Sequence, residues 1–555
     1  MILAATLAAS ADVYLDRTGS APRLIVDGRP MLILGGELGN SSATCAEDVS
    51  SIFPRLNRMG LNTVLVPAYW ELIEPEQGRF DFSTIDDVLS EARLNGLKVV
   101  FLWFGAWKNS MSCYAPLWFK TDYKKYPRAR TRAGRPLEIA SAFSPEVFRA
   151  DSMAFCRLLD HIDKADHDDT VIAIQIENEI GMLEDARDHS RLADKIYRQG
   201  VPARLCDYIN RNRDSLTPHL AGALKARRLA PGMSWNEAFG DETDADEIFM
   251  AWNYAAYVER LARCAKACSE RPLYVNAAMD SRGRRAGQYP SAGPLAKLLD
   301  VWMAAAPSLD FYSPDIYDDG FKDWVAGYVR PGNILFVPEI KRSTGNAAQA
   351  FYIIGEHDAI GLSPFSIENG DDSPSTSNAM GYRLLAEMTP LLVEAQGTGR
   401  MHGLFFDNDS ITRVLVQDGM KITASHYFTL PWDPRGSDGS RWPETGGVII
   451  RVAPMEYIIA GSGLVVKFED PDTQSDGKLR GEDGFISQGT GPDVDKQWSG
   501  RRAIGLGSVC EIEIKPDGSY RPVRSFNGDE THQGRHVRIG VDDFKALHVR
   551  LYEYK

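Results

Sequence analysis

The 555-residue sequence has few cysteines, no excess of basic residues and no long apolar run. Its seven cysteines are scattered, and Cys264 and Cys268 have no neighbouring histidine or second cysteine pair to complete a zinc site. Neither a disulfide framework nor a metal centre is therefore expected. The formal net charge of −14 argues against nucleic acid or an anionic membrane as the main partner. No stretch approaches the ~18–20 apolar residues of a membrane-spanning helix.

The first residues, MILAATLAASADV, are apolar and include an Ala-Ser-Ala sequence like a signal-peptidase site. The basic residues that open a signal peptide are missing. Residues 1–20 are therefore interpreted as an export-signal remnant or a disordered start. A periplasmic or secreted protein is expected, and a cytoplasmic one stays open.

Short apolar runs recur between residues 31 and 367, with helical patterns between them. The runs are rich in Val, Ile, Leu and Phe without clean alternation, which is typical of strands buried on both faces. Eight strands alternating with helices predict a (β/α)8 TIM barrel over residues 21–398. An open, doubly wound sheet is the alternative, because closure leaves no signal in the sequence. The predicted strands are 31–38, 61–68, 98–105, 171–178, 272–279, 309–316, 333–340 and 359–367.

Two further regions flank this pattern. A long polar segment after ENEIG predicts a helical insertion at about residues 185–250, on the active face of the barrel, where it would shape or cover the cleft. After residue 399, short strand-like pieces such as GGVIIRVAP and HVRLYEY are separated by turns rich in Gly and Asp. This texture predicts a β-sandwich accessory domain over residues 399–555.

Two glutamates stand where chemistry is expected in such a barrel, at the C-terminal ends of strands. Glu179 follows the fourth predicted strand in VIAIQIENEIG, and Glu339 ends the seventh in LFVPEIK. The ends of strands four and seven face each other across a barrel mouth. Paired carboxylates can cleave a glycosidic bond, one protonating the leaving oxygen while the other attacks the anomeric carbon or activates water. A separation of about 5–5.5 Å would imply retention of configuration, and a wider gap inversion.

The alternative is that each glutamate is an ion-pair partner at the barrel rim. Buried charge without a partner is costly, however, and the sequence ENE concentrates two acids at the end of one strand. Period-two alternation would put Gln175, Glu177 and Glu179 on one side, with Glu179 nearest the mouth and Glu177 one layer below. Glu179 is therefore favoured for the chemistry, with a raised pKa. Glu177 would be a supporting residue or an internal ion-pair partner.

In patches over roughly residues 22–370, the chain resembles the family 35 glycoside hydrolases, clan A barrels of the β-galactosidase type. QIENEIG is similar to the family's Q-V-E-N-E-Y-G, and VPAYWELIEPEQGRFDF to VPWNxHEPxxGxFxF. LDFYSPDIYDDGF is similar to VDIYGxDSYPxGF. The resemblance implies that Glu179 is the acid/base, Asn178 contacts the sugar 2-hydroxyl, Glu339 is the nucleophile and Tyr317 lies near the sugar or nucleophile. It also implies a retaining mechanism without metal or organic cofactor.

Further substrate contacts are expected at the ends of strands two and three. Trp70 and Trp107 could stack on sugar faces, although core packing is the usual role of tryptophan in a barrel. Glu71 is in register with the second family motif. The third strand departs from the family, whose RPGPYxxAEWxxGGxPxWL carries a glutamate that helps to hold galactose. Here LWFGAWKNSMSCYAPLWF aligns Asn109 with that glutamate, so the departure bears on the choice of sugar.

The sequence thus predicts a retaining, exo-acting glycoside hydrolase that removes terminal β-D-galactosyl residues from a carbohydrate. One alternative keeps the mechanism and changes the sugar to a β-glucoside, β-mannoside or arabinoside. Another is a non-catalytic carbohydrate-binding protein. The sandwich could bind carbohydrate, shape the cleft or form an oligomer interface, and the sequence does not predict the oligomeric state.

Overall fold

A computed structural model describes residues 13–240, 242–280, 283–472, 474–480, 486–488, 495–497 and 502–554. Most of the predicted export signal or disordered start, residues 1–12, lies outside the described residues. Within the described residues, no helix is both long and apolar enough to cross a bilayer.

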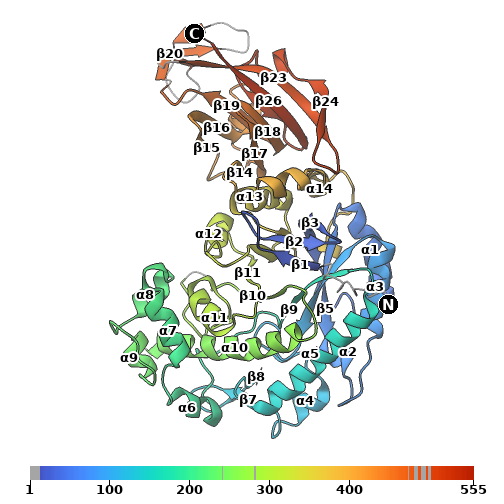
Figure 1. The fold of residues 1–555 in the computed structure, drawn as a ribbon, viewed down its shortest axis with the longest axis vertical. Coiled ribbons are helices and arrows are strands. Elements are labelled where there is room, and N and C mark those ends of the chain that lie inside the picture. Colours follow the sequence, from blue (N-terminus) through green and yellow to red (C-terminus); the bar gives the residue numbers. More distant parts are fainter. Residues whose placement is uncertain are drawn as a thin grey trace, which may run out of the picture.

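The predicted barrel is confirmed: eight parallel strands close on themselves. The barrel lies below the strands of the C-terminal region in Figure 1. Closure is visible at two junctions, where Gly361 pairs with Ile33 and Leu273 pairs with Ile174. The open-sheet alternative is thereby excluded. In chain order the strands are β4 (Ile33–Glu37), β5 (Thr63–Tyr69), β6 (Lys98–Phe104), β9 (Val171–Gln175), β10 (Leu273–Ala277), β11 (Phe311–Ile316), β12 (Phe336–Ile340) and β13 (Gly361–Pro364).

The strands form a barrel because they are apolar on both faces. All residues of β5, β9 and β12 are buried, as expected for strands between an inner core and a helical layer. Inside the barrel, Ile33 and Leu65 belong to the same apolar cluster as Val13, Leu24 and Val26. The latter three come from a small antiparallel sheet of β1 (Val13–Asp16), β2 (Arg23–Val26) and β3 (Arg29–Met31). This sheet therefore contributes to the barrel's interior core.

Helices cover the outside of the barrel. Helix α5 begins after Ser144, whose hydroxyl accepts the N–H of Val147, and Pro145 occupies its first turn. The helices of this layer are α1 (Ala46–Arg58), α2 (Trp70–Ile73), α3 (Ser83–Leu94), α4 (Leu117–Thr121), α5 (Pro145–Ala165), α10 (Glu242–Lys266), α11 (Leu299–Ala305), α12 (Phe321–Ala326), α13 (Asn346–His357) and α14 (Ser377–Ala395). A hairpin of β7 (Arg128–Arg130) and β8 (Pro136–Ala140) lies between β6 and α5.

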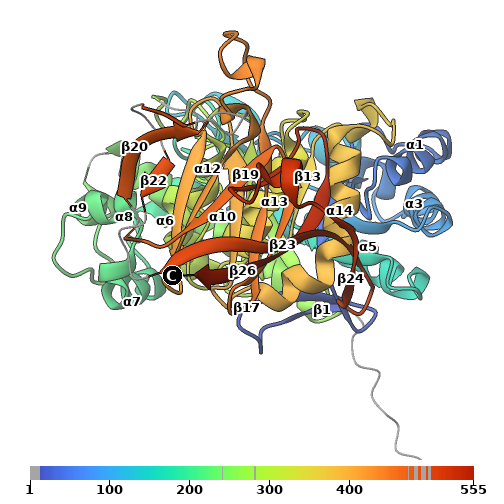
Figure 2. The ribbon, with the colours of Figure 1, turned by 90° about the horizontal axis from the view of Figure 1, so that it is seen from above.

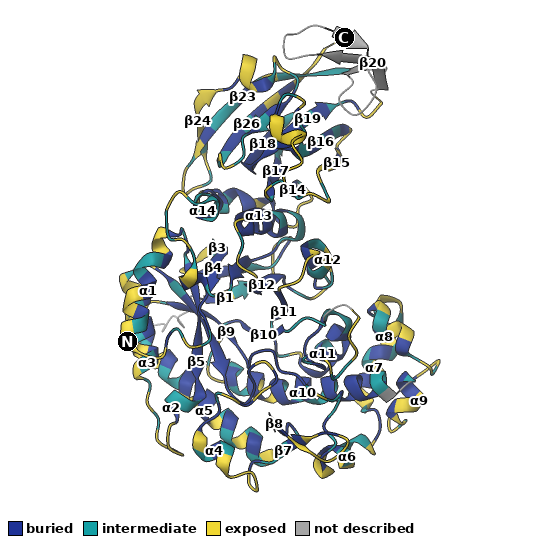
Figure 3. Cartoon of the chain, turned by 180° about the vertical axis from the view of Figure 1, so that it is seen from behind, coloured by how far each residue is buried: buried dark blue, intermediate teal, exposed yellow. Residues whose placement is uncertain are grey.

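The segment between β9 and α10 is largely helical. It contains α6 (Arg191–Tyr197), α7 (Ala203–Arg211), α8 (Pro218–Ala223) and α9 (Trp235–Phe239). Figures 1 to 3 show α7, α8 and α9 on the side of the barrel opposite α1 and α3. This is the segment in which the sequence predicts an insertion.

The C-terminal region is all-β, as predicted, with two main antiparallel sheets. Their inner faces enclose an apolar cluster that includes Ile422, Ile449 and Val466. One sheet has the order β14 (Met401–Phe406), β17 (Thr445–Ala453), β18 (Glu456–Ser462), β26 (Lys545–Tyr554), β23 (Ala503–Ile514), β24 (Tyr520–Ser525). The other has the order β15 (Thr412–Gln417), β16 (Met420–His426), β19 (Leu464–Glu469), β25 (Val537–Ile539).

The sandwich packs directly on the barrel. Its strands lie over α13 and α14 (Figure 2), and α13 is largely buried between the two units (Figure 3). Val448 and Ile458 of the sandwich belong to the same apolar cluster as the barrel's outer layer. A Cβ atom on Gly355 of α13 would lie 2.6 Å from the Val448 side chain and 2.9 Å from Gly403 Cα. Only glycine therefore fits at this contact.

Candidate active site

A cavity of about 320 Å³ opens at the C-terminal mouth of the barrel. The residues around it come from the ends of every barrel strand except β5. Among the described residues, none from the helical segment at about 185–250 lines the cavity, so the expected covering role of that segment is not observed. The cavity is lined by Asn40, Lys108, Asn109, Glu179, Ala278, Met279, Tyr317, Asp318, Glu339 and Phe365.

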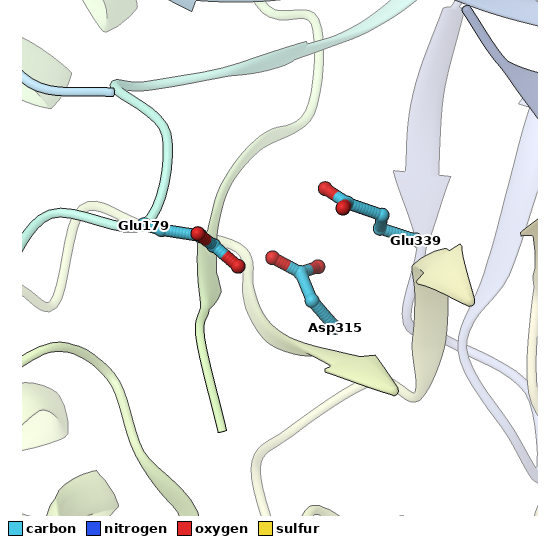
Figure 4. A group of neighbouring side chains, drawn as sticks. All are labelled: Glu179, Asp315 and Glu339. Carbon is cyan, nitrogen blue, oxygen red and sulfur yellow. The ribbon is translucent and has the colours of Figure 1, made fainter. Parts of the chain in front are cut away.

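Three buried carboxyl groups meet at this cavity (Figure 4). One oxygen each of Glu179, Asp315 and Glu339 lies within 4.8 Å of the other two. Glu179 and Glu339 therefore come together across the mouth, although they are far apart in the sequence. Asp315, at the end of β11, is part of the same group and was not singled out from the sequence.

Irregular backbone positions Glu179. Strand β9 ends at Gln175, after which Glu177 and Glu179 adopt positive φ angles of 58° and 45°. Such angles are costly for residues other than glycine and cluster at functional sites. The Glu179 N–H donates to Asn276 Oδ1 at 3.0 Å, and Asn109 Nδ2 donates to Glu179 Oε2. Asn109, the residue aligned with the family's galactose-binding glutamate, thus contacts the candidate acid directly.

The break in the strand sends Glu177 away from the mouth, so the prediction that it lies one layer below Glu179 on the same side is wrong. Glu177 accepts the backbone N–H groups of Ala106 at 3.3 Å and Trp107 at 2.8 Å. Burial, followed by the neighbouring Asp151 on α5, raises its pKa well above the usual range. Asp151 in turn accepts hydrogen bonds from Trp103 Nε1 at 2.9 Å and Tyr257 OH at 2.5 Å.

Glu339 ends β12 and is 3% exposed. The hydroxyl of Tyr317 donates to its Oε1, while its Oε2 has no hydrogen-bond partner in the described part of the chain. Glu37, at the end of β4, is 0% exposed and neither of its oxygens is hydrogen-bonded within the described residues. Burial and the charge of Glu339 raise the pKa of Glu37 well above the usual range. Glu37 is therefore interpreted as a protonated carboxyl beside the cavity.

The pKa of Glu179 is raised to about 7. Burial is the main cause and the charge of Glu339 the second, whereas the charge of Lys108 and hydrogen bonding by Asp315 and Asn109 act in the opposite direction. Glu179 can therefore hold a proton near neutral pH, as a general acid must.

Lys108 is the one cationic side chain among the described residues that line the cavity. It is 4% exposed, and its Nζ lies 5.1 Å from the centre of the Phe104 ring. Lys108 was not recognised from the sequence as a site residue.

Glu179, Asp315 and Glu339 also form a donor set of the kind that hard divalent cations bind. Metal binding requires ionised carboxylates, whereas the pKa values of Glu179 and Asp315 are raised. The Lys108 ammonium also lines the cavity and would repel a cation. The group therefore suits proton transfer better than metal binding.

Several predicted contacts do not reach the cavity. Trp70 is fully buried, donates to Glu74 Oε2 at 2.9 Å and packs on Trp103. Trp107 is fully buried and packs edge-on against Tyr257. Both rings belong to the cluster of the outer layer because these strand-end side chains turn toward the helices.

The Glu71 side chain is 40% exposed and lies 3.8 Å from Lys120, outside the residues that line the cavity. Asn178 is fully buried beside Glu179, and neither atom of its side-chain amide is hydrogen-bonded within the described residues. Its amide is therefore available to a ligand, although Asn178 does not line the cavity as the structure stands.

Asp315 and Glu37 carry a signal that the sequence does contain. Each is an acid at the C-terminal end of a predicted barrel strand, in SPDIY and LGGEL, which is the argument used for Glu179 and Glu339. Lys108 and Asn276 have no comparable signal, because a lysine in a loop and an asparagine in a strand are common.

Comparison with known proteins gives matches to two family models. The model of glycoside hydrolase family 42, described as "Beta-galactosidase", matches residues 42–214. A "Domain of unknown function (DUF5597)" matches residues 379–538, in the C-terminal sandwich. The matches support a clan A glycosidase, and family 35 specifically has no support among them.

A curated β-galactosidase from Xanthomonas manihotis is 30% identical over 181 residues, which make up 31% of this chain and 27% of that protein. Beta-galactosidase 11 of Arabidopsis thaliana is 35% identical over 79 residues, 14% of this chain and 9% of that protein. The chain therefore spans about a quarter of the first relative and under a tenth of the second. A solved β-galactosidase structure from Rahnella sp. R3 matches with 17% identity and a TM-score of 0.40, covering 61% of this chain and 50% of that one.

Proposed function

We propose that the protein is a retaining, exo-acting glycoside hydrolase that removes terminal β-D-galactosyl residues. The observation that carries the proposal is the approach of Glu179 and Glu339, with oxygens within 4.8 Å, in a cavity at the barrel mouth. An approach of the nearest oxygens within 4.8 Å is compatible with the spacing of about 5–5.5 Å between carboxyl groups that is typical of a carboxyl nucleophile. The partial matches to β-galactosidases favour the sugar.

In the first half-reaction, Glu179 donates its proton to the glycosidic oxygen while Glu339 attacks the anomeric carbon. The leaving alcohol departs, and an ester joins the sugar to Glu339. In the second, the Glu179 carboxylate takes a proton from water, whose oxygen attacks the same carbon and releases Glu339. Two inversions give net retention.

Neighbouring side chains support these roles. Tyr317 donates to Glu339 Oε1 and can orient the nucleophile. Asn109 donates to Glu179 Oε2 and can orient the acid/base. The unpaired amide of Asn178 is suited to the 2-hydroxyl of the sugar, the contact that its motif implies. A β-glucoside, β-mannoside or arabinoside is the alternative substrate, because Asn109 stands where the family has its galactose-binding glutamate.

Membership of family 35 and export from the cytoplasm remain predictions. The former rests on QIENEIG and EPEQGRFDF, and the latter on residues 1–20. A carbohydrate substrate is the partner that the proposal requires.

The test is a panel of p-nitrophenyl glycosides: β-galactoside, β-glucoside, β-mannoside, α-arabinoside and, as a negative control, α-galactoside. The parent is expected to prefer the β-galactoside and to release β-galactose first, as followed by proton NMR. Glu339→Ala should lose activity by at least about 10³-fold, and added azide should yield the α-galactosyl azide. Glu387→Ala, an exposed acid on α14, is the matched control.

Preference for another β-glycoside would overturn the proposed galactose specificity and leave the proposed mechanism in place. Full activity in Glu339→Ala would overturn the nucleophile. A folded parent that hydrolyses none of the glycosides would overturn the enzyme proposal and favour a carbohydrate-binding protein.

A further inference from the structure

Asp315 occupies a position between the two carboxyls of the proposed reaction. It belongs to β11, is 0% exposed, and has an oxygen within 4.8 Å of an oxygen of both Glu179 and Glu339. Figure 4 shows its carboxyl group between theirs. A two-carboxylate mechanism does not use this third group, so its role needs a separate explanation.

The hydrogen bonds around Asp315 determine which oxygen can carry a proton. The Glu179 N–H donates to Asn276 at 3.0 Å, so the Asn276 atom at this contact must be Oδ1. The other end of the amide is then the NH2 group, which donates to Asp315 Oδ2 at 2.6 Å. Oδ2 is therefore an acceptor. A proton on Asp315 is carried by Oδ1, which is buried and has no hydrogen-bond partner in the described part of the chain.

The surroundings favour that proton. Burial is the main reason that the pKa of Asp315 is raised well above the usual range, and nearby carboxylates, led by Glu339, raise it further. Adjacent carboxyls in a dry site cannot all ionise, because like charges at this distance repel strongly. One ammonium group is available to balance them among the described cavity residues. The titratable groups that interact with Asp315 are Glu37 on β4, Glu179 after β9, Tyr274 on β10, Tyr317 after β11, Tyr328 after α12 and Glu339 on β12, and Lys108 after β6 lines the same cavity.

We propose that Asp315 is a fixed hydrogen-bond donor that serves both half-reactions, through Oδ1–H. In the free enzyme it donates to the ionised Glu339. In the glycosyl-enzyme, where Glu339 is esterified and Glu179 is ionised, it donates to Glu179. The inference rests on the proposed function, because the alternation of charge between the two glutamates exists only in a double displacement.

The protons balance without any exchange at Asp315. The proton of Glu179 leaves with the alcohol, and water returns one to Glu179 in the second step. Asp315 keeps its own proton throughout and changes only its acceptor. One of its two neighbours is always the anion, so a donor between them stabilises each charged state in turn. Through Asn276, the same carboxyl also holds the backbone of Glu179 at its positive φ.

The test uses Asp315→Asn and Asp315→Leu in the full-length protein. Asparagine reproduces the protonated form, with an acceptor toward Asn276 and an N–H donor in place of Oδ1–H. Leucine keeps a similar volume and removes the donor. We expect the Asn variant to keep kcat/KM within about tenfold of the parent and the Leu variant to lose about 10²–10³-fold, mostly in kcat, as when one donor to a developing charge is removed.

Asp319→Asn is the matched control, since it makes the same change at an exposed position outside the residues lining the cavity. The fold of each variant is checked by circular dichroism and thermal unfolding. Single-turnover kinetics with an activated aryl galactoside separate the two steps, and the Leu variant should slow both. The basic limb of the Asn variant's pH profile should match that of the parent.

Equal losses of kcat/KM in Asp315→Asn and Asp315→Leu would show that an ionised carboxylate is needed at this position and would overturn the inference. The proposed function would still stand, because the parent would still hydrolyse the β-galactoside. Loss of parental activity in EDTA, with recovery on adding Mg²⁺ or Ca²⁺, would also overturn it, because Asp315 would then be a metal ligand. If the Leu variant fails to fold, the comparison of Asp315→Asn with the parent and Asp319→Asn decides. A folded parent inactive on all glycosides would overturn both proposals.

Discussion

Two groups of buried carboxyls lie on opposite sides of the same strand ends. The wall pair, Asp151 and Glu177, faces the helical layer. Asp151 accepts one hydrogen bond from an indole N–H and one from a tyrosine hydroxyl, and Glu177 accepts two from backbone N–H groups. The mouth group, Glu37, Glu179, Asp315 and Glu339, faces the cavity and keeps oxygens without a partner among the described residues.

Both groups are buried, and both contain carboxyls whose pKa values are raised. A raised pKa alone therefore does not separate chemistry from structural support in this molecule. The two roles are separated by carboxyl oxygens that lie next to a cavity and have no hydrogen-bond partner. The oxygens of the wall pair are all bonded to the protein, whereas the mouth group has oxygens that a ligand can bind.

The largest contrast is expected between Glu179→Gln and Glu177→Gln. Removing the acid at position 179 should lower kcat/KM for a β-galactoside with a poor leaving group by about 10²–10⁴-fold. The change at position 177 should leave it near the parental value. In the parent, activity should fall as pH rises through about 7, because Glu179 must be protonated to donate.

Steady-state pH–rate profiles of kcat/KM for the parent and both glutamine variants check this contrast. The basic limb should disappear in Glu179→Gln and persist in Glu177→Gln. A parental profile that stays flat above pH 7 would contradict the assignment of Glu179 as the acid.

A smaller contrast is expected between two tyrosines, each of which donates to one of the carboxyl groups. Tyr317→Phe removes the bond to Glu339 and should lower kcat/KM by about 10–100-fold, with little change in unfolding. Tyr257→Phe removes the bond to Asp151 and should reduce the free energy of unfolding by about 1–3 kcal/mol, with kcat/KM nearly unchanged. Kinetics and urea unfolding of both variants test the pattern, and the reverse pattern would contradict it.

The smallest effect concerns the proton of the wall pair. The pKa of Glu177 is raised in the folded protein, so its contribution to stability is fully present below the unfolded value of about 4.3 and is lost as pH rises through the folded value. The protonated Glu177 carboxyl donates a hydrogen bond to Asp151. Glu177→Gln keeps a donor for that bond and gives up one backbone acceptor, which should cost about 1 kcal/mol at pH 5. That difference should shrink toward pH 9, as measured by urea unfolding. A difference that grows with pH would mean that Glu177 is ionised in the fold.

Much of the architecture was predictable because the strands are apolar throughout. The runs at 171–178 and 333–340 contain β9 and β12, and buried strands of this kind leave a continuous apolar signal. Two acids of the site could be predicted for the opposite reason, because Glu179 and Glu339 interrupt the apolar runs at the ends of strands. Asp315 interrupts the apolar run of β11 in the same way, but the two-carboxylate mechanism gives no reason to expect a third acid.

The remaining features depend on geometry that the sequence does not display. The orientation of Glu177 follows from the end of β9 at Gln175 and the positive φ that follows, whereas period-two counting assumes that the strand continues. Trp70 and Trp107 could have faced either the mouth or the helices, and packing against Trp103 and Tyr257 decides for the helices. Lys108 is recognised as a site residue only because the fold places it beside acids from other strands.

The glycine contact between Gly355 and Gly403 has a consequence for how the chain could be divided or recombined. Helix α13 follows the strand that carries Glu339, and its outer side is covered by the sandwich rather than by water. A barrel separated from residues beyond 400 would present that apolar side to solvent. The sandwich thus covers part of the barrel's outer apolar layer. We therefore expect the two units to fold and to be exchanged only together.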